Sequence, residues 1–429
     1  ANALTGGGAR QLAFSDGTVD VGFTATAGST TIELGGTVVS SAANAAVVPT
    51  TIDATTTSTA STTPAATPAA TTGTTLTTVA DLLTGGATDD LFSGMIGSNT
   101  ATGALADTAQ NVDIITGGDG NDTIKIQTQA GGNLALKLDG VENVDYTVFA
   151  AQTYNMANST GVTKITNTGS IANLTITNAP AIVELAATNV TGNSTIVTYI
   201  AAATAGLTDV QNVVLSGAIN THTIDLNDAG IETLNITSST KENSIVLDDI
   251  GASITTINVT GDQKLTLTFL DTTGSADAIT TFNASAASGG IVADLATNVD
   301  ASVMAVTTGS GVDQITFTNL TKDDSFDLGD GEDQLTVTTL VSTTTAPVLT
   351  SVESLVLSTG NNVDASLNVA NATSLKSVGI TERDNTNTDT ITLTQAPATA
   401  VTINFNSSDG TTNAAVYDDV SFALKTSAG

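Results

Sequence analysis

Hydrophobic residues recur along most of the chain in one short pattern. From residue 79 onward, an apolar residue is followed three positions later by a second and five positions later by a third, as in Ile231-Leu234-Ile236. Successive copies begin 23 and 25 residues apart at Ile231, Ile254 and Ile279 (254 − 231 = 23; 279 − 254 = 25). A repeat of this length is typical of a solenoid, in which each coil buries its apolar residues against its neighbours. The other copies are Val141-Val144-Tyr146, Val162-Ile165-Asn167, Val210-Val213-Leu215, Ile254-Ile257-Val259, Ile279-Phe282-Ala284, Ala301-Met304-Val306, Val352-Leu355-Leu357, Leu375-Val378-Ile380 and Ala398-Val401-Ile403.

The residues between the apolar positions favour strands over helices. Thr, Val, Ile, Asn and Gly dominate, and long segments with a 3.6-residue apolar period are missing. The sequence therefore predicts an all-β protein whose fold is a parallel β-helix or β-roll-like solenoid. Tandem β-sandwich domains are the alternative, because their short strands also recur at close intervals. The segment Ile171-Leu174-Ile176 fits the pattern but is out of step with it, which indicates a chance match.

The composition divides the chain into three parts. Residues 1–49 contain alternating apolar and polar stretches, at 18–23 and 30–34, and are expected to form a short β segment or the end of a preceding domain. Residues 50–78 are rich in Thr, Ala and Pro and are expected to form a linker. Residues 79–429 are the repetitive solenoid. No signal-peptide pattern follows Ala1, and we expect the chain to be a mature or excised piece of a longer secreted polypeptide.

The charge of the chain limits the partners that it can bind. Ten Lys and Arg residues stand against 42 Asp and Glu residues, which gives a net charge of −32. So few cations cannot form a surface for nucleic acid or for an anionic membrane, and no apolar run is long enough to span a membrane. The absence of Cys excludes disulfides and thiolate metal sites. Self-repulsion on this scale opposes compaction unless a multivalent cation such as Ca²⁺ neutralises part of the charge.

Four segments concentrate Gly and Asp in a tighter motif. Residues 117–125 fit the pattern Gly-Gly-x-Gly-x-Asp-x-apolar-x throughout, and 309–315 and 329–335 fit it from the second glycine onward. Residues 85–92 fit it least, because Thr88 replaces a glycine. Glycines permit turns in which carbonyl oxygens converge, and the aspartate adds a carboxylate, so the motif predicts Ca²⁺ binding. The candidate metal-binding residues are Gly118, Asp119, Gly120, Asp122, Gly309, Gly311, Asp313, Gly329, Asp330, Gly331, Asp333 and Asp90.

The spacing of the turns indicates which of them stack. Because Ca²⁺ takes about six to eight oxygen ligands, a full site needs two stacked turns. Asp313 and Asp333 are one coil apart (333 − 313 = 20), which predicts a Ca²⁺ shared between their turns. Asp90 and Asp122 are less securely paired, because their separation (122 − 90 = 32) does not match a whole number of coils. Between the two best turns, Asp324 and its neighbours are expected to be solvated turn residues, with further Ca²⁺ ligation as the alternative.

The motifs at 117–125, 309–315 and 329–335 resemble the RTX (repeat-in-toxin, haemolysin-type) calcium-binding repeats, and the chain is similar to surface-layer proteins of Gram-negative bacteria that carry them. Two further segments add to this resemblance, Gly140-Val141-Glu142-Asn143-Val144 and Gly230-Ile231-Glu232-Thr233-Leu234. The resemblance implies type I secretion, folding on meeting external Ca²⁺, and assembly into a lattice on the cell exterior. It also implies that Asp122, Asp313 and Asp333 are carboxylate ligands. The isolated turns differ from the long tandem arrays of the family.

The chain offers little for catalysis. Only Arg10 and Arg383 are available as arginines, Trp is absent, and His222 is the sole histidine. His222 lies in an alternating segment and is expected on an exposed strand face, where it would not act as a base. We therefore do not expect an enzyme.

Three functions remain in order of preference. The first is a structural surface-layer (S-layer) subunit that is secreted and self-assembles into a calcium-dependent lattice. Attachment to a cell-surface glycan or lipopolysaccharide would then use a region outside this chain. The second is a fragment of a secreted RTX adhesin, and the third is a β-helical enzyme acting on polysaccharides. The motifs separate the first two poorly, because both would be acidic, secreted and Ca²⁺-bound.

Overall fold

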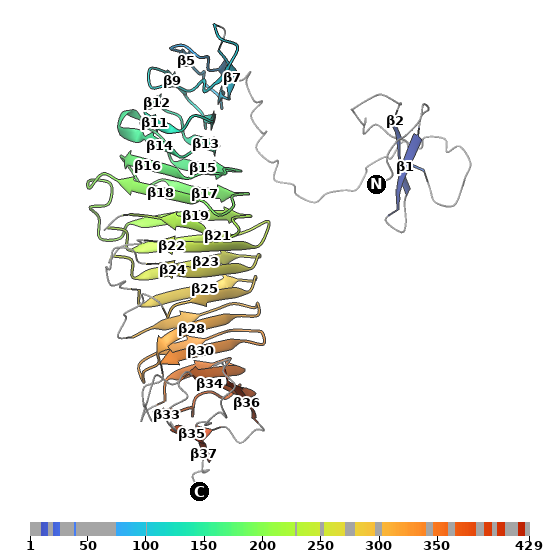
Figure 1. The fold of residues 1–429 in the computed structure, drawn as a ribbon, viewed down its shortest axis with the longest axis vertical. Coiled ribbons are helices and arrows are strands. Elements are labelled where there is room, and N and C mark those ends of the chain that lie inside the picture. The colour runs from blue at the N-terminus through green and yellow to red at the C-terminus, as the bar shows by residue number, and fades with distance from the viewer. Residues whose placement is uncertain are drawn as a thin grey trace, which may run out of the picture. The chain divides into compact units, whose positions relative to one another are not determined.

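The structure is a computed structural model, and its strands are stacked along much of the chain (Figure 1). It describes residues 10–15, 20–25, 38–39, 74–99, 101–227, 230–248, 253–270, 279–296, 303–339, 346–358, 365–382, 390–396, 401–407 and 419–424. The strand expected at 30–34 and most of the linker expected at 50–78 lie outside these residues, as do Ala301 and Ala398 of the repeat.

The chain forms two compact units, residues 1–67 and 68–429. In the first unit, β1 (Arg10–Ser15) pairs antiparallel with β2 (Asp20–Ala25), and β2 pairs with β3 (Val38–Val39). The second unit begins its strand pairing at β4 (Thr74–Thr75) and contains the repeat.

Two 13-stranded sheets, here called sheet I and sheet II, make up most of the second unit. Sheet I consists of β4, β6 (Leu91–Gly94), β10 (Thr123–Thr128), β13 (Asn143–Val148), β15 (Lys164–Thr168), β17 (Glu184–Thr188), β19 (Val210–Ser216), β21 (Thr233–Ser238), β23 (Thr256–Gly261), β25 (Thr281–Ala287), β27 (Ala305–Thr307), β29 (Ser325–Asp327) and β31 (Val348–Thr350). Sheet II consists of β11 (Gly132–Leu134), β14 (Gln152–Asn155), β16 (Leu174–Ala179), β18 (Ser194–Tyr199), β20 (His222–Asp225), β22 (Asn243–Asp248), β24 (Leu265–Leu270), β26 (Ile291–Asp294), β28 (Gln314–Asn319), β30 (Gln334–Thr339), β32 (Ser354–Ser358), β34 (Ser377–Glu382) and β36 (Thr402–Ser407).

Three smaller sheets and one 3₁₀ turn complete the described part of this unit. The turn is η1 (Met156–Asn158). The strands are β5 (Leu82–Thr84), β9 (Ile114–Thr116) and β12 (Lys137–Asp139) in one sheet, β33 (Ala365–Asn368), β35 (Thr390–Ala396) and β37 (Asp419–Leu424) in another, and the antiparallel pair β7 (Gly97–Ser98) and β8 (Leu105–Ala106). No helix in the described residues is long and apolar enough to cross a membrane.

The coils stack in parallel register. Between β13 and β32 the chain alternates strictly between sheet I and sheet II, and each strand pairs with the strand one coil away. In sheet I, Thr123, Asn143 and Lys164 lie in register, so these coils contain 20 and 21 residues (143 − 123; 164 − 143). The predicted β-solenoid is confirmed. The tandem β-sandwich alternative is wrong, because sandwich strands pair antiparallel within a sheet.

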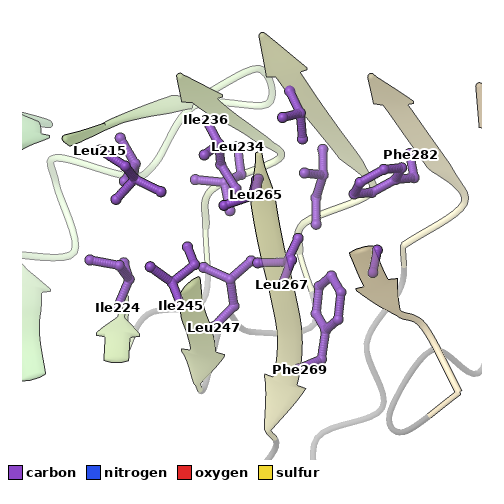
Figure 2. Packing of buried hydrophobic residues seen from close by; sticks show 14 of the residues in the cluster. Leu215, Ile224, Leu234, Ile236, Ile245, Leu247, Leu265, Leu267, Phe269 and Phe282 are labelled. Atoms are coloured by element: carbon purple, nitrogen blue, oxygen red, sulfur yellow. The ribbon is translucent and has the colours of Figure 1, made fainter. Parts of the chain in front are cut away.

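The predicted apolar rows form the core between the two sheets. Strand side chains alternate between the inside and the outside, so Leu234 and Ile236 of β21 are buried while Asn235 between them faces outward. Ile245 and Leu247 of β22, in the facing sheet II, are buried as well. Figure 2 shows that the side chains of the two sheets pack against each other. Each coil contributes only a few such residues, so its core is completed by the coils above and below.

The segment that seemed out of step belongs to the other sheet. Leu174 and Ile176 are buried in β16 of sheet II, whereas Ile171 is 71% exposed. The copy at Val352-Leu355-Leu357 likewise lies in sheet II, although the earlier copies lie in sheet I. Interpreting the 171–176 match as chance was therefore wrong, because one coil contains two strands with similar inward patterns.

The expectation that His222 is exposed is wrong. In β20, His222 has the same parity as the inward-facing Ile224, so both side chains are fully buried. Its Nε2 lies 3.1 Å from Thr195 Oγ1, which also accepts a 2.8 Å hydrogen bond from Asn167 Nδ2. Burial disfavours the imidazolium and lowers the pKa of His222 to about 4.

This buried histidine predicts an acid-sensitive core. Because its folded pKa lies below the ordinary 6.5, its contribution to stability is complete above pH 6.5 and is lost as the pH falls toward 4. Over this pH range, we expect the unfolding free energy of the wild type to fall by up to about 3 kcal/mol relative to that of His222→Gln. Chemical unfolding at a series of pH values measures it, and parallel profiles of the two proteins would contradict the assignment.

Candidate metal centre

The two best glycine–aspartate turns lie directly on one another, as their 20-residue spacing predicts. Gln314 and Gln334, which follow the two turns, are in register between β28 and β30. The Asp313 N–H donates to Asp333 Oδ1 at 2.8 Å, and the Asp330 N–H donates to the Gly309 carbonyl at 2.9 Å. Residues 309–313 and 329–333 therefore form one continuous row of turns.

Asp90 and Asp122 are also stacked, although their spacing was a weaker indication for this pair. Leu91 of β6 is in register with Thr123 of β10, and the Asp90 N–H donates to Asp122 Oδ1 at 2.7 Å. The coil between them is long because it contains the β7–β8 hairpin. The separation of 32 residues is thus a single enlarged coil.

The two rows occupy different corners of the solenoid. The turn at 117–122 connects β9 of a small sheet to β10 of sheet I. The turn at 309–313 connects β27 of sheet I to β28 of sheet II. The candidate residues therefore form two separate sites, one toward each end of the stack (Figure 1).

A glutamate closes each row of carboxylates. Glu142 Oε2 accepts the Asp122 N–H at 2.7 Å, and Glu353 Oε2 accepts the Asp333 N–H at 3.0 Å. Glu232 does the same for the Asp209 N–H at 2.7 Å. Sequence reasoning missed this role, although a signal was present: each of these glutamates directly follows the first apolar residue of the repeat.

Three of the candidate aspartates are buried with one oxygen unsatisfied. Asp122, Asp313 and Asp333 have 0% exposure. Each Oδ1 accepts a backbone N–H from the preceding coil, but each Oδ2 is buried without a hydrogen-bond partner in the described structure. Burial raises the pKa of all three carboxyls, to about 6 for Asp333, where the neighbouring carboxylates Asp313, Glu353 and Glu332 add to the effect. Burying a carboxylate oxygen without a partner destabilises the folded state, and a bound cation would remove this cost.

Two other buried aspartates show that burial alone does not produce this arrangement. Asp324 accepts N–H bonds from Met304 and Thr321 at 2.7 and 2.6 Å, one on each oxygen. Asp113 is satisfied in the same way by Asp81 and Gln110. The expectation that Asp324 is a solvated turn residue is wrong, because its carboxylate is buried and closes the turn that precedes β29. Among the described aspartates, the buried oxygens without a hydrogen-bond partner are those on the glycine turns.

The glycines leave room where oxygens converge. A β-carbon on Gly117 would lie 1.7 Å from the Gly140 carbonyl oxygen and 2.2 Å from Asp122 Oδ2. One coil earlier, a β-carbon on Gly85 would lie 2.0 Å from the Gly117 carbonyl oxygen and 2.5 Å from Asp90 Oδ2. In the second row, Gly331 has φ +153° and a β-carbon there would lie 2.2 Å from the Gly311 carbonyl oxygen. Only glycine permits these approaches.

The donor set fits a hard cation. The polar atoms that approach Gly85, Gly117 and Gly331 most closely are carboxylate and carbonyl oxygens, which are the ligands that Ca²⁺ takes. Within the described residues, no group of three or more His, Cys, Asp or Glu side chains is arranged to hold a metal. A Ca²⁺ ion here would combine carboxylate oxygens with main-chain carbonyls of the glycine turns.

The remaining candidates lie at the surface of the turns. Asp119 and Asp330 are exposed, and their backbone N–H groups bond to the carbonyls of Gly86 and Gly309 in the preceding coil. Gly118, Gly120 and Gly329 adopt positive φ and shape the same turns, as does Gly331; Gly309 and Gly311 instead permit close approach of the preceding coil. No family model and no curated protein matches the chain.

The unsatisfied oxygens predict opposite effects of one substitution with and without Ca²⁺. Asp333→Asn keeps the Oδ1 acceptor and removes an unpaired negative charge, so we expect it to raise the unfolding free energy in chelator and to lower it, relative to wild type, in millimolar Ca²⁺. The matched variant Asp324→Asn loses a satisfied acceptor and should be destabilised by about 1–3 kcal/mol in both buffers. Denaturant unfolding and Ca²⁺ stoichiometry measure this, and equal destabilisation of Asp333→Asn in both buffers would exclude ligation by this carboxylate.

The raised pKa of Asp333 predicts a reversal of pH dependence. Since its folded pKa is about 6, above the ordinary 3.8, its contribution to stability is complete below pH 3.8 and is lost as the pH rises through 6. In chelator, wild type should therefore gain stability relative to Asp333→Asn as the pH falls from 7 to 4. In Ca²⁺ the sign should reverse, because the ion binds only the carboxylate. The same sign in both buffers would contradict the prediction.

Proposed function

We propose that the chain is a structural surface-layer subunit, secreted to the exterior of a bacterial cell and assembled into a calcium-dependent lattice. The observation that supports this most directly is the set of three buried Oδ2 atoms without partners, on Asp122, Asp313 and Asp333. They lie in stacked glycine turns whose sequences resemble RTX repeats. A regular stack of similar coils suits a structural role.

In this proposal Ca²⁺ completes the solenoid. Without the ion, the buried carboxylates and the net charge of −32 oppose stacking of the coils. With it, each bound ion contributes its binding energy to folding, because the unfolded chain does not hold the ligands together. A chain made where Ca²⁺ is scarce would stay loosely folded and would fold after export.

The proposal predicts a visible assembly. Purified protein should form regular two-dimensional arrays by electron microscopy in millimolar Ca²⁺, and the arrays should dissolve when a chelator is added. Light scattering should follow the same change in solution. Equal folding and equal monomer content in both buffers would exclude the calcium-dependent lattice, whereas Ca²⁺-dependent folding without arrays would favour the adhesin alternative.

A further inference from the structure

Five adjacent strands of sheet I present a face without charge. The strands β19, β21, β23, β25 and β27 contain no Asp, Glu, Lys, Arg or His. Glu184 in β17 and Asp327 in β29 bound this region on its two sides. We call the outward side chains of these five strands the neutral face. In a chain of net charge −32, these strands carry no fixed charge, and the nearest carboxylates along the chain, Asp209 and Glu232, directly precede β19 and β21.

The opposite side of the same coils is different. Asp225, Asp248 and Asp294 occupy outward positions on β20, β22 and β26 of sheet II. Asp225 and Asp248 are in register on neighbouring strands. We call the outward side chains of β20, β22, β24 and β26 the acidic side. Its three carboxylates make it less favourable than the neutral face for the approach of another negatively charged copy.

A ladder of asparagines fixes the side chains of the neutral face. Asn235 Nδ2 donates to Asn212 Oδ1 at 2.9 Å, and Asn258 Nδ2 donates to Asn235 Oδ1 at 2.9 Å. The ladder continues through Asn283, which bonds to Asn258 at 3.4 Å and accepts from Thr307 at 3.0 Å. Because the bonds already restrain these side chains, little rotamer freedom is lost when another surface covers them. Two runs of neighbouring strands in sheet II, β11 to β18 and β28 to β32, are uncharged too, and the longer asparagine ladder distinguishes the neutral face from them.

The unused hydrogen-bonding groups of the ladder match a surface that has the same spacing between strands. An amide has two N–H donors and two acceptor sites. Asn235 and Asn258 each use one donor and one acceptor in the ladder and keep one of each, whereas Asn283 Oδ1 already accepts from Ser285 and Thr307. Successive rows lie about 4.8 Å apart, the spacing of paired strands. Another β-solenoid face has this spacing as well, and a second copy of the chain supplies it together with matching donors and acceptors.

We propose that the neutral face is the surface on which a second copy of this chain packs. The proposal rests on the self-assembly proposed above and names the part of the solenoid that carries it. Five strands at about 4.8 Å and five residues at about 3.4 Å give roughly 400 Å² per partner. This is about half of a standard interface, so the contact is weak by itself and holds when it is repeated in a lattice.

A matched pair of substitutions tests the face. Thr256→Glu adds a charge to β23 in the neutral face, and Thr266→Glu adds the same charge to β24 on the acidic side; both threonines are half-buried. By sedimentation equilibrium in millimolar Ca²⁺, we expect Thr256→Glu to weaken self-association at least tenfold and Thr266→Glu to change it less than twofold. Circular dichroism and Ca²⁺ stoichiometry should match wild type in both.

Salt and cross-linking provide readouts that do not depend on these variants. Association through an uncharged face should strengthen with added NaCl, because screening reduces the repulsion between copies, whereas a contact built on ion pairs would weaken. Since the chain has no cysteine, Thr237→Cys in the neutral face can be compared with Thr268→Cys on the acidic side, using a short bismaleimide. Only Thr237→Cys should give cross-linked dimers.

The outcomes separate this proposal from the one it rests on. If arrays form equally well with Thr256→Glu, or if Thr268→Cys cross-links in place of Thr237→Cys, the neutral face is not the contact surface. The proposal of a calcium-dependent lattice would not be affected. A wild-type protein that stays monomeric in Ca²⁺ at all concentrations would overturn both.

Discussion

The parallel, in-register stacking of one coil on the next is the constraint on which this protein depends. The main-chain bonds between strands fix each residue above its counterpart one coil away. A few apolar side chains per coil then become continuous rows, and residues such as Leu234 and Ile257 are buried by neighbours of the same kind. Aromatic residues are only 3% of the chain, and the core forms without them because it is thin and repeated.

The same stacking collects the charged and polar residues into rows. Aspartates at the ends of turns come to lie under the N–H groups of the preceding coil, which is why Asp122 and Asp333 are buried although each follows a glycine-rich turn. Each accepts one N–H bond and keeps one oxygen unsatisfied. Where the turn instead offers two N–H donors, as around Asp324, no such oxygen remains. The difference between a closed turn and a proposed cation site is therefore one hydrogen bond.

Outside the core, stacking gives the two sheets different surfaces. Asparagines 212, 235 and 258 form a hydrogen-bonded ladder because they occupy the same outward position in successive coils. Carboxylates recur in the turns and on the facing sheet, where Asp225 and Asp248 are adjacent. Within the described residues, five neighbouring strands of sheet I carry no charge, and the proposed assembly uses their outward face.

The sequence by itself determined the fold class, the length of the coil and the stacking of 309–313 on 329–333, because periodic burial and a spacing of one coil are written directly in the order of residues. It did not determine which of two sheets a match belonged to, so Ile171-Leu174-Ile176 was taken for chance and His222 for an exposed residue. It also left Asp90 and Asp122 uncertain, since an inserted hairpin lengthens their coil. Only the tertiary structure decided which aspartates are satisfied. Hydrogen bonding between coils depends on the N–H groups of the preceding coil, and these are distant in sequence and carry no signal in residue type.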